Sequence, residues 1–403
     1  MTVIDRFFQL ISIESTADES SETCPSSPGQ LLVAQEAVAQ MLAMGIADAR
    51  VDANGYVTGT IPANCDRNLP ATGLVAHMDT SPDAPGKDIR ARLTELYEGG
   101  DIVLNEELGL VLSPSDYPSL NNHIGKHLIV TDGTTLLSSD DKAGVAEILA
   151  AAEILLHTDR PHGKICIGFT PDEEIGRGTD HFDIPGFGAE FAYTVDGGAL
   201  GEIEYENFNA ASASVVIHGR SIHPGSGKGK MINASLVAIE LNSLLPALET
   251  PFYTEGYEGF FHLTDICGKC ERAELNYIIR DHDRVLFERR KQIMETAVGQ
   301  INEKYGAGTA DLAMKDTYYN MKEKIEPFFF LIDNAKAAFE KNGVTPRIIP
   351  IRGGTDGVRL SYDGLPCPNL CTGGENFHSR FEYCVAEDME TMVKILVDLL
   401  TVQ

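Results

Sequence analysis

Three short apolar segments, each ending in histidine or followed within two residues by a carboxylate, most strongly constrain how this chain can fold. They are Ala71–His77, Lys164–Thr170 and Phe191–Val195. Runs of this length without regular polar alternation are typical of strands that are buried on both faces. Helical patterns occupy Gln30–Met44 and Gly144–Leu156, so strands and helices alternate. This order predicts an α/β domain whose mixed, mostly parallel sheet is flanked by helices.

The pattern changes at about Asn209, where a second, smaller domain is predicted to begin. Strand, helix, strand, strand, helix and strand patterns follow one another there, which is the order of a ferredoxin-like α+β fold. The predicted elements are Ala210–Gly219, Asn233–Leu248, Gly259–Ile266, Ala273–Asp281, Arg284–Tyr305 and Thr309–Tyr319. After them, helix and strand patterns of the first kind resume. The simplest organisation is a ferredoxin-like domain of residues 209–320, inserted into a first domain of residues 1–208 and 321–403.

The charge balance narrows the range of possible partners. The chain has 403 residues, with 32 Lys and Arg against 60 Asp and Glu, and its formal net charge is −28. So large a negative charge disfavours phosphate backbones and anionic bilayers, and we expect neither a nucleic-acid nor a membrane partner. In agreement, no segment reaches the roughly 18 uncharged apolar residues that a membrane-spanning helix needs.

The cysteines and the first residues favour a cytoplasmic protein. Eight cysteines are scattered through a long chain, a pattern that is typical of reduced thiols and not of a disulfide framework. Only Cys267 and Cys270 have a suggestive spacing, and a turn is the favoured interpretation because no second Cys or His pair lies nearby. Met1–Ile13 has neither the basic start nor the uninterrupted apolar core of a signal peptide.

Histidines and carboxylates gather where the predicted strands end. Ligands of open α/β sheets bind beyond the carboxyl ends of the strands, so this placement indicates a site. The residues concerned, at strand ends or in nearby turns, are His77, Asp79, Asp140, Asp141, Asp172, Glu173, Glu174, Asp196 and His378. Two histidines with several carboxylates match the ligand set of co-catalytic zinc sites, in which one carboxylate bridges two metal ions.

Each of these residues also has an ordinary structural explanation. Asp140 or Asp141 could cap the helix that follows, and the acidic run ending at Glu174 could be a solvated turn. A single histidine near a strand end, such as His77, is usually structural. Spacing alone also leaves open which of Glu173 and Glu174 would bind a metal and which would be a general base.

Six motifs along the chain together resemble one group of enzymes. They are Ala76–Thr80, Ser139–Gly144, Pro171–Gly176, Tyr193–Gly198, Glu204–Ala211 and Gly373–His378. With these motifs and their spacing, the chain is similar over essentially its whole length to the tripeptide aminopeptidases of the aminoacylase/carboxypeptidase G superfamily of di-zinc exopeptidases. The resemblance implies two zinc ions per chain and release of the N-terminal residue from short peptides, mainly tripeptides.

The resemblance also implies a role for each residue at the strand ends. His77 and Asp196 would bind one zinc ion, and Glu174 and His378 would bind the other. Asp140 would bridge the two ions. Asp79 would orient His77 and have a catalytic role through it, and Glu173 would be the general base that activates a metal-bridging water.

The inserted domain would act on the substrate. His223, in the loop after the first strand of this domain, resembles a lid histidine that could donate to the developing oxyanion. Asn233 and Arg280 stand where related enzymes grip the substrate carboxylate, and Arg352 could do the same, since a guanidinium binds a carboxylate through two hydrogen bonds. Related enzymes often pair through this domain, so a homodimer is a further expectation.

Two kinds of alternative remain at this stage. Within the superfamily, a dipeptidase, a carboxypeptidase or an N-acyl-amino-acid hydrolase would use the same metal chemistry. Outside it, the chain could be a non-catalytic peptide-binding or metal-storage protein, although both the presumed base and the bridging carboxylate are present.

Overall fold

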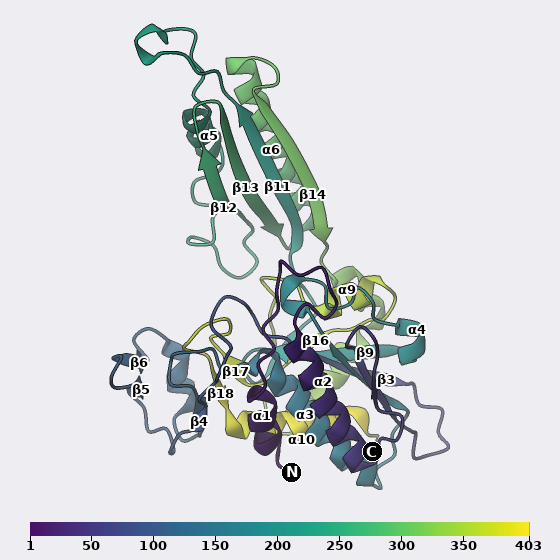
Figure 1. The fold of residues 1–403 in the computed structure, drawn as a ribbon. Coiled ribbons are helices and arrows are strands. Elements are labelled where there is room, and N and C mark those ends of the chain that lie inside the picture. The colour runs from purple at the N-terminus through teal and green to yellow at the C-terminus, as the bar shows by residue number, and fades with distance from the viewer. Residues whose placement is uncertain (403) are drawn as a thin grey trace. The chain divides into compact units, whose positions relative to one another are not determined.

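The computed structural model describes residues 1–402, which divide into two compact units (Figure 1). The first unit contains Met1–Tyr205, Glu323–Ile349 and Thr355–Gln403, and the second contains Glu206–Lys322 and Pro350–Gly354. The segment 350–354 groups with the second unit because Ile351 forms a parallel bridge with Asn207 and its carbonyl oxygen lies 3.0 Å from His282 Nε2.

A mixed eight-stranded sheet forms the centre of the first unit, as predicted. Its strands, in spatial order, are β1 (Arg50–Val51), β2 (Val57–Ile61), β8 (Ile165–Thr170), β3 (Thr72–His77), β9 (Phe191–Gly197), β16 (Asn369–Cys371), β10 (Glu202–Glu204) and β15 (Arg347–Ile348). The four central strands, from β8 to β16, are parallel to one another. Strands β3 and β8 are buried along almost their whole length, which explains why their sequences are continuous apolar runs.

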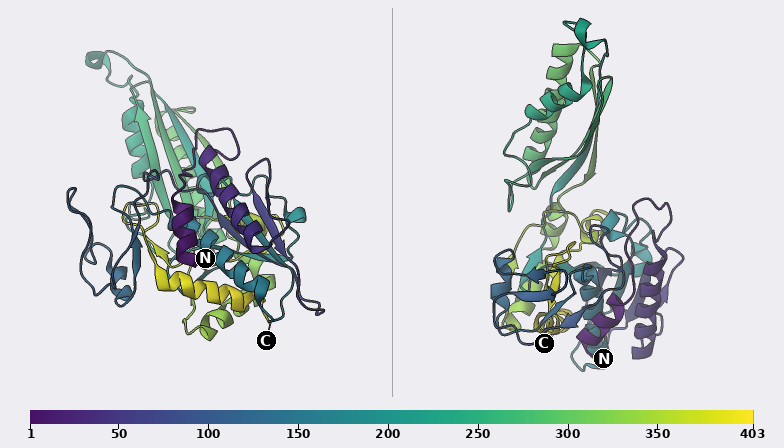
Figure 2. Two further views of the ribbon diagram at one scale, coloured as in Figure 1. Left: turned by 60° about the horizontal axis from the view of Figure 1, so that its bottom comes forward. Right: turned by 60° about the vertical axis from the view of Figure 1, so that its left-hand side comes forward.

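Helices and smaller sheets complete the first unit (Figure 2). The helices are α1 (Val3–Ile11), α2 (Pro28–Met44), α3 (Ser139–His157), α4 (Ile184–Phe187), α7 (Lys322–Ile325), α8 (Phe330–Lys341), α9 (Asp356–Tyr362) and α10 (Ala386–Leu400), with 3-10 turns η1 (Pro118–His123), η2 (Glu173–Ile175) and η4 (Glu326–Phe328). A second sheet contains β17 (Gly374–Glu375), β18 (Tyr383–Val385), β7 (Leu128–Val130) and β4 (Arg92–Leu93), and a hairpin contains β5 (Ile102–Asn105) and β6 (Leu110–Leu112).

The start of α3 comes unusually close to the central sheet. A Cβ atom added at Gly144 would lie 1.9 Å from the backbone oxygen of Val195 in β9, so only glycine permits this approach. The close approach brings the first turn of α3, which carries Asp140, next to the end of β9, which carries Asp196.

The second unit is the predicted ferredoxin-like fold. Its elements are β11 (Asn209–His218), η3 (Pro224–Ser226), α5 (Ala234–Ser243), β12 (Phe260–Gly268), β13 (Arg272–Asp281), α6 (Arg284–Tyr305) and β14 (Ala310–Tyr318). The strands are antiparallel in the order β12-β13-β11-β14. Alternate residues of β11, such as Val215 and Ile217, pack with α5 and α6 in an apolar core. Helix α5 ends five residues before the predicted Leu248, because Pro246 cannot supply the backbone N–H that a continuing helix requires.

No helix within residues 1–402 combines the length and the apolar character that crossing a membrane would require.

Glu147 of α3 gives a prediction about stability. Its side chain is fully buried, and neither carboxyl oxygen has a hydrogen-bond partner among the described residues. Burial raises the pKa of Glu147 well above its usual range, and the nearby charge of Asp388 adds to this effect. In the folded chain, burial therefore favours the neutral form of the Glu147 carboxyl.

We expect Glu147→Gln to flatten the fall of stability with rising pH. The folded pKa lies above the unfolded one, so the contribution of Glu147 is complete below the unfolded pKa and is lost as the pH rises toward the folded pKa. Over that window, the free energy of unfolding of the wild type should fall relative to the variant by up to about 1.4 kcal/mol per pH unit. Urea unfolding between pH 5 and 8 measures this difference. The exposed Glu107→Gln is the control, and a difference that does not vary with pH would refute the prediction.

Candidate metal centre and active site

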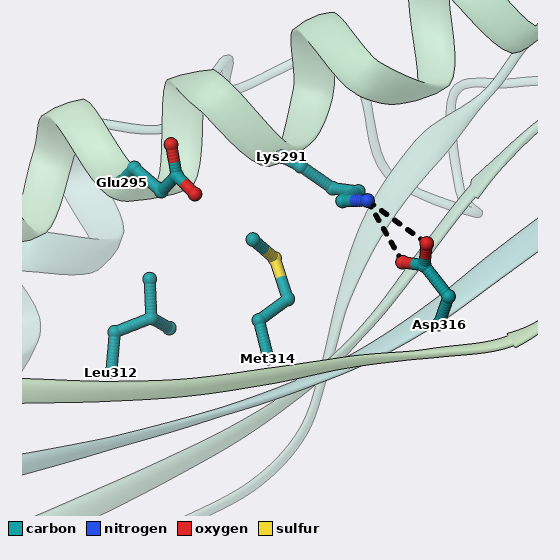
Figure 3. A pocket seen from close by; sticks show the side chains of 5 residues that line it. All are labelled: Lys291, Glu295, Leu312, Met314 and Asp316. Carbon is teal, nitrogen blue, oxygen red and sulfur yellow. Dashed lines mark hydrogen bonds and ion pairs between the residues drawn. The ribbon is translucent and has the colours of Figure 1, made fainter.

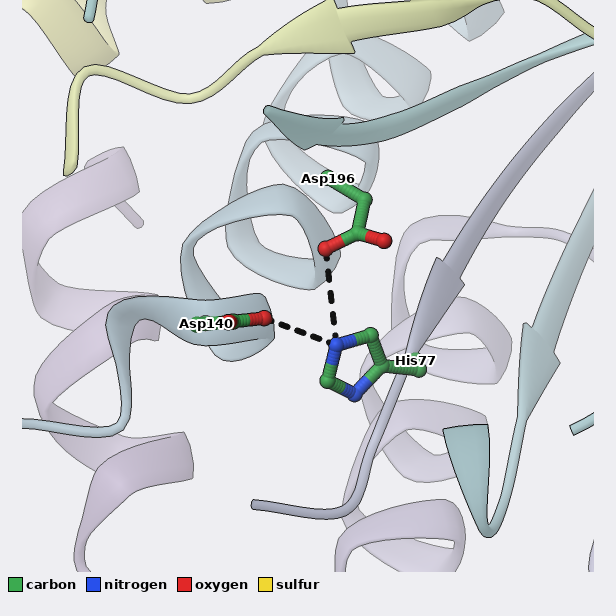
Figure 4. Close-up of side chains that lie close together, drawn as sticks. All are labelled: His77, Asp140 and Asp196. Atoms are coloured by element: carbon green, nitrogen blue, oxygen red, sulfur yellow. Dashed lines mark hydrogen bonds and ion pairs between the residues drawn. The ribbon is translucent and has the colours of Figure 1, made fainter. Parts of the chain in front are cut away.

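His77 lies at the carboxyl end of β3, where two carboxylates surround its ring (Figure 4). Its Nε2 atom is 2.8 Å from Asp140 Oδ1 and 3.4 Å from Asp196 Oδ1. The backbone N–H of His77 donates to Asp141 Oδ2 at 3.1 Å, so the second aspartate of the pair supports the strand end. One ligand atom from each of His77, Asp140 and Asp196 lies within 4.8 Å of the other two, which makes them the first candidate metal group.

Asp79 connects His77 to the acidic turn after β8. Its side chain is fully buried, and its Oδ1 atom lies 3.4 Å from His77 Nδ1, while its backbone oxygen lies 3.1 Å from the same nitrogen. The two carboxylate oxygens also accept hydrogen bonds from the backbone N–H groups of Glu173 and Glu174, each at 3.0 Å. One aspartate thus orients both the imidazole ring and the turn that carries the two glutamates.

Asp140, Glu174 and His378 form the second candidate metal group. The Nε2 atom of His378 is 2.9 Å from Glu174 Oε2 and 3.3 Å from Asp140 Oδ2. The other ring nitrogen of His378 is 3.1 Å from Asp83 Oδ2. Asp140 is therefore the member that both groups share, with one oxygen directed to each histidine.

The imidazoles and carboxylates shift one another's protonation. Burial by itself lowers the pKa of His77, because it disfavours the charged imidazole. The Asp196 and Asp140 carboxylates outweigh this effect and raise the pKa of His77 well above its usual range. Hydrogen bonds to Asp140 and Glu174 raise the pKa of His378 to about 11. Burial raises the pKa of Glu174 to about 7 and that of Asp196 to about 6. The crowded carboxylates thus create a negative potential that favours positive charge in the site.

Divalent metal ions fit this donor set. Imidazole nitrogen and carboxylate oxygen are the ligands that zinc and related ions accept, and both groups offer them at short mutual distance. Glu174 Oε1 is buried and has no hydrogen-bond partner among residues 1–402, as expected of an atom that is oriented for a cation. The negative potential of the site also favours binding of a divalent cation.

Glu173 adjoins this site but belongs to neither metal group. Burial raises the pKa of the Glu173 carboxyl well above its usual range, and the Asp196 and Asp356 charges act in the same direction. The turn that presents it begins at Asp172, which has a left-handed backbone with φ of 57°. Asp172 is fixed there because its carboxylate accepts hydrogen bonds from Ser26 N at 2.9 Å and Gln30 Nε2 at 2.7 Å.

Two of the three predicted lid residues lie in loops or caps of the second unit, and Arg352, predicted near the sheet of the first domain, belongs to the second unit as well. His223 is exposed, and its Nδ1 atom accepts a hydrogen bond from the Gly225 N–H at the start of η3. Asn233 is the N-cap of α5, and its Oδ1 atom accepts the Ser235 N–H at 3.1 Å. The side-chain oxygen of Asn233 therefore has a structural task, independent of any substrate.

The two arginines are held by carbonyl groups and aromatic rings of the same unit. Arg280 Nη1 donates to Ile279 O at 3.1 Å, and its guanidinium lies 5.3 Å from the centre of the Tyr318 ring. Arg352 donates to the backbone oxygens of Thr254 and Gly256, at 3.2 and 2.8 Å, and lies over the rings of Phe208 and Phe260. Arg352 thus fastens segment 350–354 to the loop that precedes β12.

A hollow of the second unit lies between α6 and β14 but has no chemistry of its own (Figure 3). Its lining residues are Lys291, Glu295, Leu312, Met314 and Asp316. The single cation, Lys291, is already paired with Asp316 at 2.9 Å and with Glu288 at 3.0 Å. The residues with catalytic potential are those at the strand ends of the first unit.

Several residues that sequence reasoning missed surround the metal groups. Asp83 contacts His378, as described above. Lys142 is almost fully buried and donates from Nζ to Ile13 O at 2.7 Å. Burial lowers the pKa of Lys142 to about 7, although Asp79 and Glu382 act in the opposite direction. Their positions depend on contacts between distant segments, and only Lys142, within the Ser139–Gly144 motif, had a signal in the sequence.

The fold described above is shared with known peptidases. A family model described as the peptidase dimerisation domain matches residues 205–309, which cover most of the second unit. The crystal structure of aminopeptidase PepT from Bacillus cereus superposes with a TM-score of 0.77 at 22% identity, covering 99% of this chain and 97% of that one. A tripeptidase from Staphylococcus aureus also gives a TM-score of 0.77, at 20% identity, with 99% and 96% covered.

Sequence similarity identifies the family within this class. Peptidase T of Caldanaerobacter subterraneus subsp. tengcongensis is 51% identical over 398 residues, which are 98% of this chain and 97% of that protein. The chain belongs to the peptidase T family, and it is accordingly an aminopeptidase, a hydrolase of peptides.

Proposed function

We propose that this chain is a zinc-dependent aminopeptidase that removes the N-terminal residue from short peptides, with tripeptides as its main substrates. The observation that carries the proposal is the position of Asp140, shared by two groups of metal-ligand atoms in a member of the peptidase T family. A carboxylate between two ligand groups is the arrangement of two-metal hydrolases. The fold that this chain shares with the Staphylococcus aureus tripeptidase supports the proposed preference for tripeptides.

Five residues would hold the two zinc ions. His77 and Asp196 would bind one ion, Glu174 and His378 the other, and Asp140 both. When bound, the ions would polarise the scissile carbonyl group and lower the pKa of the attacking water. Asp79 supports this arrangement, because it touches the His77 ring and both glutamate N–H groups.

Glu173 would move the proton during hydrolysis. Its side chain lies beside the ligands without belonging to either group, so its carboxylate can act as a base. It would take a proton from the attacking water and deliver it to the amine nitrogen that leaves, which are the two proton transfers that peptide hydrolysis needs.

The second unit would contribute groups that contact the substrate. The exposed imidazole of His223 can donate to the carbonyl oxygen as negative charge develops there. Asn233, Arg280 and Arg352 would contact the carboxylate of the peptide, and a fixed carboxylate site would select peptides by length.

We also propose a homodimer and a cytoplasmic location. The dimer is supported by the match of residues 205–309 to a peptidase dimerisation domain. The location is supported by the cysteines, all eight of which are unpaired, since such thiols persist in a reducing compartment.

A panel of peptides tests this function. Di-, tri- and tetrapeptides, each with a free or an acetylated N-terminus, are given to the zinc-loaded enzyme and the products are identified by mass spectrometry. We expect release of the N-terminal residue from free tripeptides, with kcat/KM about tenfold or more above that of the other lengths, and no cleavage after acetylation. A chelator should abolish the activity and added zinc should restore it.

The alternative functions give different products in the same assay. Cleavage of acetylated peptides would indicate an N-acyl-amino-acid hydrolase, and release of the C-terminal residue would indicate a carboxypeptidase. Preference for dipeptides would indicate a dipeptidase. Absence of any cleavage by the zinc-loaded chain would indicate a non-catalytic protein and would refute the proposal.

A further inference from the structure

Glu382 accepts an unusual number of hydrogen bonds from the loop that carries Asp140. Its Oε2 atom accepts the backbone N–H groups of Leu137 at 2.7 Å and Ser138 at 3.0 Å. Its Oε1 atom accepts the N–H of Ser139 at 2.7 Å, the Ser139 hydroxyl at 2.5 Å and the N–H of Asp140 at 3.2 Å. One carboxylate therefore binds four consecutive backbone N–H groups that immediately precede and include the shared metal ligand.

The backbone of this loop is shaped to bind an anion. Ser138 has a left-handed conformation with φ of 71° and ψ of 26°, and its side chain is fully buried. Successive N–H groups around a left-handed residue point to one side and form a concave anion-binding nest. All five donors need an acceptor oxygen, and the two oxygens of the Glu382 side chain supply the acceptor positions. The Glu382 side chain thus fills the concave side of the loop.

Glu382 is also connected to the second histidine of the site. It lies in the turn between β17 and β18, the same turn that carries His378. Hydrogen bonds hold this turn together, including Ser379 Oγ to Asn376 O at 2.8 Å and Glu382 N to Ser379 O at 3.3 Å. His378 Nε2 in turn lies 3.3 Å from Asp140 Oδ2. The Glu382 carboxylate therefore joins the loop of Asp140 to the turn of His378, and Glu382 itself is 242 residues from Asp140 in the chain.

We propose that Glu382 is a positioning residue, which fixes Asp140 relative to His378 and thereby sets the affinity of the site for metal. The role assigned to the metal rests on the proposed function. Glu382 belongs to neither ligand group, and it acts through the backbone of residues 137–140. Since Asp140 belongs to both ligand groups, displacement of this loop would weaken both metal positions together.

The variant Glu382→Gln tests the proposal with little change of shape. A glutamine has one acceptor oxygen, so its NH2 group must face backbone N–H donors on one side of the nest. We expect its zinc affinity, measured by competition with a chromophoric chelator, to fall by about 10–100-fold at both positions. We also expect kcat to recover in part at saturating zinc, with KM for a tripeptide near the wild-type value.

Glu387→Gln is the matched control. Glu387 is also a carboxylate that accepts a backbone N–H, that of His127 at 2.9 Å, and it lies in the first turn of helix α10. The hydrogen-bond partner of its side chain within residues 1–402 is His127, which carries no metal ligand. We expect its zinc affinity and activity to equal those of the wild type. Wild-type zinc affinity in folded Glu382→Gln, or an equal loss in both variants, would overturn the proposal.

A second measurement does not depend on catalysis, and its wild-type part does not require that the variant folds. Amide hydrogen exchange of the metal-free wild type, followed by NMR, reports whether the N–H groups of residues 137–140 are protected. Protection in the wild type is expected, with faster exchange at these four positions in Glu382→Gln. Rapid exchange at these positions in the wild type would refute the positioning role. If the wild type bound no zinc, the proposed function would fail instead, while the exchange result would still report on the nest.

Discussion

Replacing Glu173 by glutamine should lower kcat by about 10²–10⁴-fold, while the chain keeps its full zinc content. Glu173 lies in the turn after β8, and Asp79 fixes its backbone N–H. Its side chain belongs to neither metal group, so the substitution leaves the five ligands in place. What the variant loses is the group that accepts the proton of the attacking water. Glutamine matches the shape of glutamate but cannot accept that proton.

Zinc content and tripeptide turnover must be measured on the same preparation. Glu106→Gln, an exposed substitution of the same type, is the control and should keep both properties. The result that contradicts the assigned role is wild-type-like turnover in Glu173→Gln. Loss of zinc in parallel with activity would instead indicate that Glu173 is a ligand and would favour Glu174 as the base.

Asp140→Asn should weaken both metal positions at once and abolish activity. Asp140 is the only residue present in both ligand groups, and its two oxygens are directed to different histidines. An asparagine keeps the size of the side chain but loses the negative charge and one acceptor oxygen, so it cannot serve two cations. We expect zinc stoichiometry, measured by elemental analysis after dialysis, to fall from two ions per chain toward none.

Variants at the unshared ligands provide the comparison. Asp196→Asn removes a ligand from the group that contains His77, and Glu174→Gln removes one from the group that contains His378. Each is expected to reduce the zinc content by one ion per chain. If Asp140→Asn also lost only a single ion, the idea of a shared ligand would be wrong.

Much of the fold could be predicted because its local patterns are strong. Buried parallel strands such as β3 and β8 need apolar residues on both faces, so they are continuous apolar runs in the sequence. Helix α6 matches its predicted bounds, Arg284–Tyr305, because Asp283 caps its start and a glycine follows its end. Predictions of helix ends are less accurate where such signals are lacking. The helix predicted from Gly144 begins at Ser139 in the structure, and its first turn contains the non-helical Asp140 and Asp141.

The supports of the site could not be predicted in the same way. Glu382 and Asp83 are ordinary acidic residues in loops, and neither spacing nor periodicity distinguishes them from solvated ones. Their roles depend on which distant segment each one meets: Glu382 meets residues 137–140, and Asp83 meets His378. Similarly, Arg352 is engaged by the loop before β12, a contact that no local pattern indicates.

Local sequence patterns are enough to predict the kinds of groups in the site and the strands that present them. Apolar runs that end in histidine or carboxylate place these groups at one edge of a sheet, because parallel strands end on the same side. Tertiary contacts determine how the two ligand groups are arranged. Asp140 lies between His77 and His378 and belongs to both groups. The Glu382 carboxylate binds the loop that carries Asp140. The difference arises because the two kinds of information depend on contacts at different separations along the chain. Strand patterns arise from neighbouring residues, whereas ligand geometry arises from segments that meet only after the chain has folded.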